Sequence, residues 1–282
     1  MNSKIPMNYV ETLFTRAAAL GTDSDEAWSH IEELRKIGSE EVFGIASNLC
    51  RSPKAQERSL GVCILAQIGG ADVPFQKQVS EVVGELIENE QDDDVVTSLI
   101  SAISFQNVTS AIPWLIEKAS SDEEDIRWRI AWALPLGLAQ NDPWHDKTIA
   151  TLIRLSQDDE PRVRDWATFS LATQTDDCRE IVANALLDRV DDSDFDTRSE
   201  ALRGLARRAD LRVTPYLRDE LSSDRVGELA VEAAEILALP ELLSPLKQLS
   251  KWWDVDAELL ANAIKACSSP TVGLGDSQTP RA

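Results

Sequence analysis

Three aspartates at alternate positions, Asp192, Asp194 and Asp196, have the spacing of the first ligands in a calcium-binding loop. Such a loop also needs a glycine at its sixth position and a bidentate glutamate at its twelfth. The sequence has Thr197 and Arg203 at those two positions. The aspartates are therefore better explained as a turn that leads into a helix, and we expect no metal site there.

Other residues that commonly carry chemistry are few. Of the two histidines, His30 and His145, only His145 has an adjacent carboxylate, and a His–Asp pair needs a nucleophile that the fold must place beside it. The chain has no HExxH motif, no paired CxxC spacing and no glycine-rich phosphate loop outside its C-terminal tail. We therefore predict no catalytic residue, no metal and no cofactor, and we expect the protein not to be an enzyme.

Charge narrows the class of partner. The chain has 282 residues with 28 Lys and Arg against 49 Asp and Glu, a net charge of −21. Such a charge repels duplex nucleic acid and anionic membrane surfaces, and it favours a basic protein or peptide through faster encounter. The sequence begins without a secretory signal, contains no apolar run long enough to span a bilayer, and its four cysteines show no disulfide or metal spacing. These features predict a cytoplasmic protein with reduced cysteines.

The elements that must position any binding residues follow a repeat. The stretch DDEPRVRDWATFSLA, residues 158–172, joins an acidic turn and a proline to an amphipathic segment with Val163 and Arg164 at its start. Copies of the segment begin at Glu57, Val95, Ile126, Val163, Thr197 and Val226, and those at Val95 and Val226 lack the arginine. A fixed period of about 34 residues is typical of a solenoid.

The repeating unit is predicted to be helix, acidic turn, helix. Aspartates in the turns suit helix N-caps, and Pro161 suits a first helical turn because it has no N–H to satisfy. Eight helix pairs are predicted, at residues 7–37, 39–70, 73–107, 108–140, 142–174, 177–209, 211–238 and 241–267. Residues 1–267 would thus form one array, and the Gly/Pro/Ser/Thr-rich tail 268–282 is predicted to be disordered.

The acidic turn followed by Val-Arg, an alanine and a leucine resembles the second helix of a HEAT repeat, including the bilin-lyase-type HEAT-like variety. The resemblance covers residues 53–238. It implies an all-α fold, a right-handed α-solenoid of about eight HEAT-like helix pairs with the second helices on its concave side. It also implies that Arg127, Arg164 and Arg198 bond to turn carboxylates between repeats, in a ladder broken at Val95 and Val226.

Helical geometry predicts which residues face a partner. With Val163 as position zero and 100° per residue, positions zero, four, seven and eight form the core face, and positions two, six and nine point away from it. Clustered exposed aromatics usually mark interaction sites, so Trp128, Trp132 and Phe169 are predicted to form an apolar anchor, with Trp166 on the flank. The candidate partner-binding residues are Trp128, Trp132, Asp165, Trp166, Phe169, Arg203, Glu228 and Glu232. The alternative is that these rings are buried against adjacent repeats.

A basic segment stands out in this acidic chain. Residues 198–218 hold six arginines against Glu200 and Asp210. These arginines either pair with acidic turns of adjacent repeats or form a site for a carboxylate or phosphate group.

Together these features predict a non-enzymatic protein-binding module or scaffold, whose acidic and aromatic concave surface binds a basic protein. One version is an immunity or inhibitor protein that neutralises a cationic toxin or nuclease. The alternative is a HEAT-like enzyme or enzyme accessory, because the resemblance also extends to bilin lyases and to DNA glycosylases. Trp128, Trp132 and Asp165 have residue types that suit a glycosylase cleft, but the overall acidity disfavours duplex binding.

Overall fold

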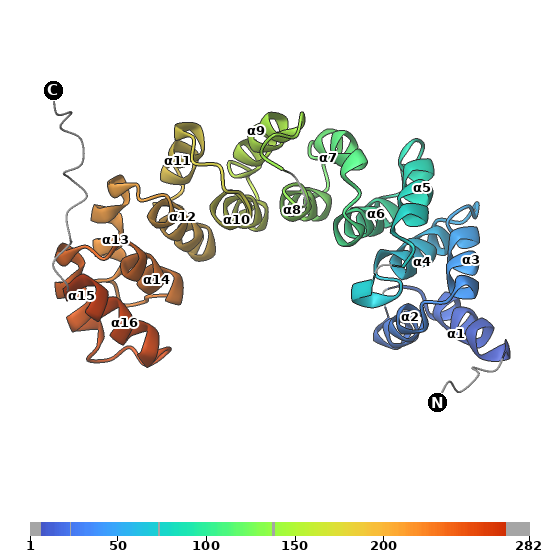
Figure 1. Ribbon diagram of the computed structural model, residues 1–282, viewed down its shortest axis with the longest axis horizontal. Helices are drawn as coiled ribbons and strands as arrows, with labels where there is room; N and C mark the ends of the chain where they lie inside the picture. Colours follow the sequence, from blue (N-terminus) through green and yellow to red (C-terminus); the bar gives the residue numbers. More distant parts are fainter. Residues whose placement is uncertain (1–6, 23, 73, 137–138, 269–282) are drawn as a thin grey trace, which may run out of the picture. The chain divides into compact units, whose positions relative to one another are not determined.

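The computed structural model describes residues 7–22, 24–72, 74–136 and 139–268, and these residues form sixteen α-helices and no strand (Figure 1). The helices are α1 (Met7–Leu20), α2 (Asp25–Ile37), α3 (Glu40–Leu49), α4 (Ala55–Ala66), α5 (Gln76–Ile87), α6 (Asp93–Gln106), α7 (Ile112–Lys118), α8 (Glu124–Ala133), α9 (His145–Leu155), α10 (Pro161–Phe169), α11 (Glu180–Leu187), α12 (Phe195–Arg207), α13 (Thr214–Glu220), α14 (Glu228–Leu237), α15 (Leu243–Leu249) and α16 (Ala257–Ser268). Short 3-10 turns are η1 (Gly70–Asp72), η2 (Thr109–Ala111), η4 (Leu211–Val213) and η5 (Pro240–Leu242), and η3 (Ser170–Gln174) is a π-helical turn after α10.

The helices follow one another as pairs, and each of the eight predicted ranges holds one pair. The predicted all-α architecture of HEAT-like helix pairs is therefore confirmed, while the handedness and concavity of the array stay predictions. The chain divides into two compact units, which we call the first unit (up to Thr151) and the second unit (from Leu152), with the boundary inside α9. Each unit is described by itself below. The predicted disordered tail lies outside the described residues, except for Ser268 at the end of α16.

Within each unit the second helices of the pairs pack against one another, α2, α4, α6 and α8 in the first and α10, α12, α14 and α16 in the second. The predicted core positions are buried. Val163, Ala167 and Leu171 each have 0% of their surface exposed. The packing is close enough that a Cβ on Gly204 of α12 would lie 2.6 Å from the Cβ of Ala172. Removal of this apolar stripe from water is the main stabilising term of such a stack.

Acidic turns begin the second helices as predicted at two places. The side chain of Asp92 accepts a hydrogen bond from the backbone N–H of Val95 (3.3 Å), and that of Asp194 accepts one from Thr197 (2.9 Å). The residues at the N-caps of α8 and α10 make no such bond, so other groups organise those turns.

The arginines of the repeat motif organise these acidic turns. Arg164 donates from Nε and Nη2 to the carboxylate of Asp192 in the next repeat, at 2.9 and 3.0 Å. Its Nη1 donates to carbonyls of its own acidic turn, at residues 158 and 159. Burial opposes ionisation of Asp192, but the hydrogen bond from Arg164, a backbone hydrogen bond from Asp194 and the charges of Arg164 and Arg189 together outweigh it and keep the pKa of Asp192 below its ordinary value. Arg58 bridges to Glu90 in the same way, at 2.7 and 3.0 Å.

The predicted bridges between repeats are present at Arg164 and Arg198, with a change of partner type at Arg198. Arg198 reaches Glu220, which lies at the end of α13 rather than in an acidic aspartate turn (3.2 Å). Arg127 donates to its own turn carbonyls, at residues 121 and 122. The copies that begin at Val95 and Val226 have Val96 and Gly227 at the arginine position, so neither can form an arginine–carboxylate bond there. The ladder therefore fixes how successive second helices sit, and with them the residues on their open face.

Candidate binding faces on the second helices

Six of the eight predicted partner-binding residues lie on three successive second helices of the second unit. We name the surface they form with two further carboxylates the acidic face. The acidic face consists of Asp165, Trp166 and Phe169 on α10, Asp196, Glu200 and Arg203 on α12, and Glu228 and Glu232 on α14. Positions two and six of neighbouring helices thus come together as helical geometry predicts.

Asp165 is the unusual carboxylate of this face. Its side chain is half-buried, and within the described part of the chain this side chain makes no hydrogen bond and no ion pair. Burial raises its pKa to about 7, and the charges of Asp196, Glu200 and Asp194 add to the rise. Ordinary aspartates ionise near pH 4, so this site holds its negative charge only against an energetic penalty.

Arg203 is the one basic member of the acidic face, and its charge is already paired with two carboxylates. It donates to Glu200 at 2.8 Å, to Thr173 at 2.8 Å and to Glu232 at 3.4 Å. Glu200 is only 9% exposed, and burial raises its pKa although Arg203 opposes the rise. Five carboxylates and one arginine therefore share the face, so acidic groups outnumber basic ones there.

Two aromatic rings adjoin these carboxylates. Trp166 and Phe169 meet edge to face, with ring centroids 5.6 Å apart, and both are half-buried. Phe169 follows Asp165 by one helical turn, so the ring and the carboxylate point to the same side of α10. The acidic face thus offers an apolar surface beside a negative charge.

The basic segment 198–218 is internally paired. Arg208 donates to backbone carbonyls around the π-helical turn η3 and to one in its own helix, at residues 171, 172, 175, 177 and 204. Arg212 bonds to Asp210 and Arg218 to Asp219. Of the two interpretations drawn from the sequence, these contacts favour internal pairing over a ligand site.

The two predicted tryptophans of the first unit have different environments. Trp128 is only 9% exposed, its Nε1 donates to Asp125 at 2.8 Å, and the guanidinium of Arg129 lies 4.5 Å above its ring. Trp128 therefore supports Arg129 rather than standing open as an anchor. Trp132 is half-buried and packs edge to face with Phe105 at 5.8 Å, while Phe105 itself is 48% exposed. One aromatic pair thus lies on the second helices of each unit.

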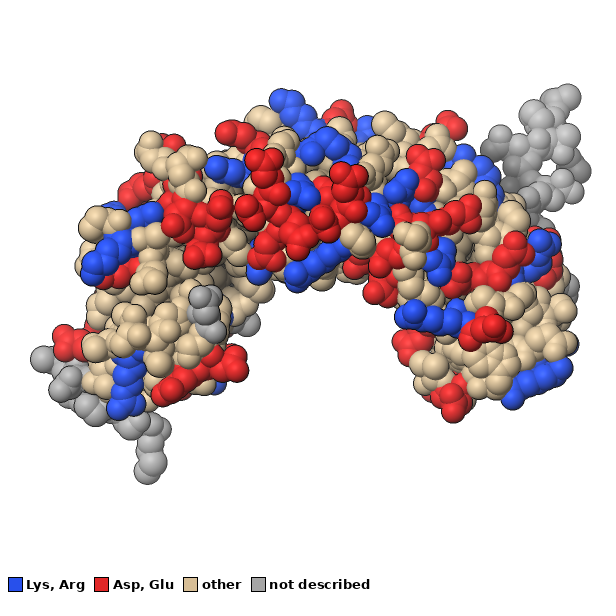
Figure 2. Space-filling view, turned by 180° about the vertical axis from the view of Figure 1, so that it is seen from behind, with Lys and Arg blue, Asp and Glu red and all other residues tan. Residues whose placement is uncertain are grey.

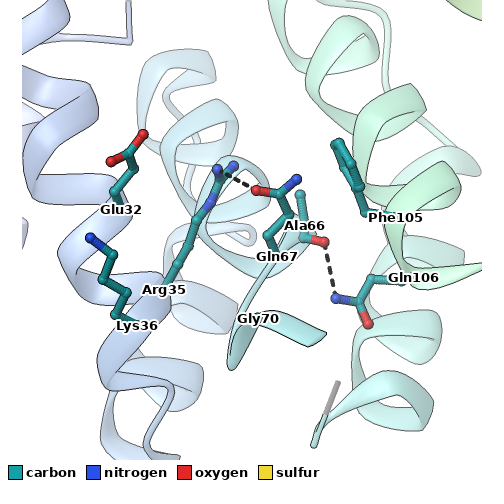
Figure 3. A pocket seen from close by; sticks show the side chains of 8 residues that line it. All are labelled: Glu32, Arg35, Lys36, Ala66, Gln67, Gly70, Phe105 and Gln106. Atoms are coloured by element: carbon teal, nitrogen blue, oxygen red, sulfur yellow. Dashed lines mark hydrogen bonds between the residues drawn. The ribbon is translucent and has the colours of Figure 1, made fainter. Parts of the chain in front are cut away.

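A hollow that the sequence did not indicate lies beside Phe105. A cavity of about 540 Å³ opens between α2, α4 and α6 (Figure 3). It is lined by Glu32, Arg35, Lys36, Ala66, Gln67, Gly70, Phe105 and Gln106. A second hollow of about 450 Å³ adjoins it and extends to Asp125 and Arg129 of α8. We call the two together the first-unit groove.

Arg35 forms the floor of this groove. Its Nε and Nη2 donate to the carbonyl of Cys63 at 3.0 and 2.6 Å, and its Nη1 donates to the side chain of Gln67 at 2.9 Å (Figure 3). Its guanidinium carbon lies 5.3 Å from the ring centre of Trp28. Burial lowers the pKa of Arg35, while the nearby Glu32 opposes that effect from beyond ion-pair distance. In the described part of the chain no carboxylate pairs with this guanidinium.

The remaining chemistry of the described residues is sparse. They contain no group of three or more His, Cys, Asp or Glu side chains placed to hold a metal ion. None of the described helices has the length and apolar character needed to cross a bilayer. Cys50, Cys63 and Cys267 are buried and Cys178 is exposed, all as free thiols. On the face drawn in Figure 2, Asp and Glu side chains gather in patches with Lys and Arg between them.

Comparison with known proteins identifies the repeat. Residues 112–199 match the family model described as HEAT repeats. Protein YibA of Escherichia coli K12 is 26% identical over 234 residues, which cover 82% of this chain and 81% of YibA. The X-ray structure of YibA superposes with a TM-score of 0.69 at 23% identity, covering 96% of this chain and 100% of that chain. An engineered protein superposes with a TM-score of 0.57 at 16% identity, covering 92% and 77%. The resemblance that the repeat motif indicated is confirmed.

Proposed function

We propose that this chain, which carries HEAT repeats, is a non-enzymatic protein-binding module whose acidic face holds a basic segment of a partner protein. A stack of helix pairs presents an extended surface made from many repeats, and such surfaces commonly bind other polypeptides. The second helices supply that surface here, because their other side forms the core.

The observation that carries the proposal is Asp165. A half-buried carboxylate without a counter-charge is unfavourable in the isolated protein. A lysine or arginine from a partner would provide the missing charge and lower the pKa of Asp165 back toward its ordinary range. Arg203 cannot do this, because Glu200 and Glu232 already hold its guanidinium.

The rings beside Asp165 indicate more closely which side chains the ligand should have. Trp166 and Phe169 offer an apolar surface on which an arginine guanidinium or an apolar neighbour can pack. The net charge of −21 would speed the approach of a basic partner. A cationic toxin or nuclease neutralised by an immunity or inhibitor protein is one partner of this chemistry, and a basic subunit of a larger assembly is another.

A second candidate function follows from the same carboxylate. A carboxyl group with a pKa of about 7 suits proton transfer near neutral pH, so an enzyme could use Asp165 as a general base. We rank it second because, among the described residues, the side chain of Asp165 makes no hydrogen bond to a nucleophile that it could activate. Binding that survives Asp165→Asn while turnover is lost would favour this alternative.

The test is selection of binders from a random peptide library displayed on phage. We expect the selected peptides to be enriched in arginine and lysine next to aromatic or aliphatic residues. They should bind the double variant Asp165→Asn, Glu232→Gln at least about tenfold more weakly, a loss of one to two charged contacts. Selection of peptides without basic residues would contradict the proposal.

A charge-matched control separates the site from the overall field. Glu81 lies in α5, which is the first helix of its pair, and Glu88 caps the end of that helix; both side chains are exposed. The control variant Glu81→Gln, Glu88→Gln changes the net charge by the same amount as Asp165→Asn, Glu232→Gln. The proposal requires that this control retain nearly full affinity. Equal loss in both variants would mean that the peptides respond only to net charge.

A further inference from the structure

We propose that the first-unit groove is a second binding site, which takes an acidic internal segment of a polypeptide. A Glu or Asp side chain would lie on Arg35 and Lys36, and a neighbouring apolar side chain would lie against Phe105. This site differs from the acidic face in unit, in charge and in ligand, so it does not depend on the proposed function.

Unused hydrogen-bond donors on Arg35 are the first argument. A guanidinium has five N–H groups. Arg35 uses three of them, two on the Cys63 carbonyl and one on the Gln67 side chain. One N–H on each terminal nitrogen is left without an acceptor in the described structure. Two such donors in a planar fork match the two oxygens of a carboxylate.

Arg208 in the second unit shows that unused N–H donors are not a general property of the protein's buried arginines. Burial also lowers the pKa of Arg208, and it too binds carbonyls at a helix end. Its three nitrogens, however, donate to five different backbone carbonyls, which saturates the guanidinium. Arg35 has a similar structural role but keeps donors for a further acceptor.

The neighbours of Arg35 add to the positive character of the cavity. Lys36 is exposed at its rim, and among the described residues no side chain pairs with it. Gln67 uses its Oε1 on Arg35, so its amide nitrogen remains a donor. Glu32 is the single carboxylate in the lining of this cavity, against two cations. The cavity is therefore locally positive in a strongly acidic chain.

The end of α4 would by itself repel an anion, because helix C-termini carry partial negative charge. Here side chains from both neighbouring helices neutralise it. Arg35 of α2 binds the carbonyl of Cys63, and Gln106 of α6 donates to the carbonyls of Leu65 and Ala66, at 3.1 and 3.0 Å. The remaining donors of Arg35 are thus available to a ligand without competition from these carbonyls.

An apolar wall faces the cations. Phe105 is 48% exposed and stands on the opposite side of the cavity from Arg35, as Figure 3 shows. Trp132 braces its ring edge to face, at 5.8 Å. An exposed ring held in place by a second ring is a typical anchor for an apolar side chain.

The groove continues past this cavity, which favours an internal segment over a chain end. The adjoining hollow shares Arg35 and Phe105 with the cavity and continues along Thr97 and Ser101 of α6 to Arg129 of α8. Hydroxyl groups of this kind can bond to the backbone of an extended peptide that crosses three second helices. The lining of this hollow also includes the carboxylates of Asp94 and Asp125, so the acidic side chain of the ligand is assigned to the cavity at Arg35 and Lys36 and not to this hollow. The salt bridge of Arg129 with Asp125 closes the far side at 3.2 Å.

The test uses a blocked probe, the acetylated and amidated heptapeptide Gly-Ser-Gly-Glu-Phe-Gly-Ser, titrated by fluorescence anisotropy. Its partner probe has Gln in place of Glu. We expect the Glu probe to bind the full chain at least about tenfold more tightly than the Gln probe. We expect Lys36→Gln to reduce that ratio by about threefold or more, and Arg35→Lys to remove most of it, since lysine lacks the planar fork.

Controls keep the outcome decisive. Lys77→Gln makes the same charge change at an exposed position of α5 and should leave the ratio unchanged, and Lys36 has no described partner whose loss could disturb folding. Asp165→Asn, Glu232→Gln should also bind the Glu probe normally, which separates this test from that of the acidic face. Equal affinity for the two probes, or equal effects of Lys36→Gln and Lys77→Gln, would overturn the proposal. Tight binding only of a probe with a free C-terminal carboxylate would overturn the assignment to an internal segment.

Discussion

In each unit a second helix carries a partly buried charged side chain that makes no ion pair in the described structure, and these two side chains have opposite signs. Arg35 in the first unit has hydrogen bonds but no carboxylate, and Asp165 in the second has neither cation nor hydrogen bond in the described structure. Arg164, the residue next to Asp165, has both, through Asp192. The pair of Arg164 with Asp192 links two successive repeats, whereas Arg35 and Asp165 lie at the two surfaces proposed to bind ligands.

The two unpaired groups also differ from each other. Arg35 ties α2 to the end of α4 and offers only its spare donors to a ligand. The side chain of Asp165 bonds to no other element, so burial of its charge lowers the free energy of unfolding. Replacing Arg35, which stabilises the fold and is proposed to bind a ligand, should lower the free energy of unfolding. Replacing Asp165, which is proposed only to bind a ligand, should raise it.

The largest effect is expected where a buried pair is broken. The side chains of Arg164 and Asp192 are 12% and 5% exposed, so Arg164→Ala leaves Asp192 unpaired and should lower the free energy of unfolding by about 3 kcal/mol. Urea denaturation measures this. Arg218→Ala is the control, because its pair with Asp219 is exposed and should contribute less than about 1 kcal/mol. Similar losses at both positions would remove the contrast between paired and unpaired charges.

A smaller loss is expected at Arg35. Arg35→Met keeps the aliphatic stem but removes the bonds to Cys63 and Gln67, and it should lower the free energy of unfolding by about 2 kcal/mol. The same urea titrations measure it. If this variant were as stable as the parent, Arg35 would have no role in the fold, and the distinction drawn between Arg35 and Asp165 would fail.

Asp165→Asn should have the opposite sign. Because the folded-state pKa of Asp165 is raised to about 7, the folded protein retains a proton that the unfolded chain releases from about pH 4 upward. Stability therefore falls between these values as pH rises, and the asparagine variant escapes that fall. We expect the variant to be more stable by about 1 kcal/mol above pH 7, allowing for partial exposure, and the advantage to vanish near pH 4. A variant less stable than the parent at pH 8 would show that Asp165 has a structural partner.

The smallest effect concerns association rates. Raising the salt concentration from about 20 mM to about 300 mM should slow the association of a basic peptide with the acidic face several-fold, because it screens the attraction to a chain of charge −21. The acidic probe meets long-range repulsion, so its association with the first-unit groove should not slow. Stopped-flow fluorescence measures both rates. Parallel salt dependence would indicate one shared site.

Local sequence was enough to predict the helix pairs and the core positions, and the resemblance to HEAT repeats implied the arginine bridges. Each depends on residues within one repeat or on its immediate successor, as with Arg164 and its turn. The acidic face was predictable for the same reason, because Asp165 and Arg203 occupy the outward positions two and six on neighbouring helices. The π-helical turn that follows Phe169 gave no signal, since the arginines that bind its carbonyls come from the next repeat.

The first-unit groove was not predictable by this route. The helix that carries Arg35 follows acidic residues but lacks the Val-Arg pair of the repeat motif, so its outward positions could not be aligned with the others. Phe105 stands at position ten of its repeat, about 40° around the helix from position six, and was not counted as outward. Trp128 was assigned to the open face by its position, but it is only 9% exposed and the guanidinium of the adjacent Arg129 lies against its ring, a contact that the helical position alone does not indicate.

The most direct test of the binding account is the pKa of Asp165 in the free protein and with a bound basic peptide, measured by carbon-13 NMR of its carboxyl group. The account predicts a pKa of about 7 in the free protein and a clear fall toward the ordinary range when the peptide is bound. A bound peptide that leaves the Asp165 titration unchanged would contradict it, because the partner's cation would then not reach the charge that this face leaves unpaired.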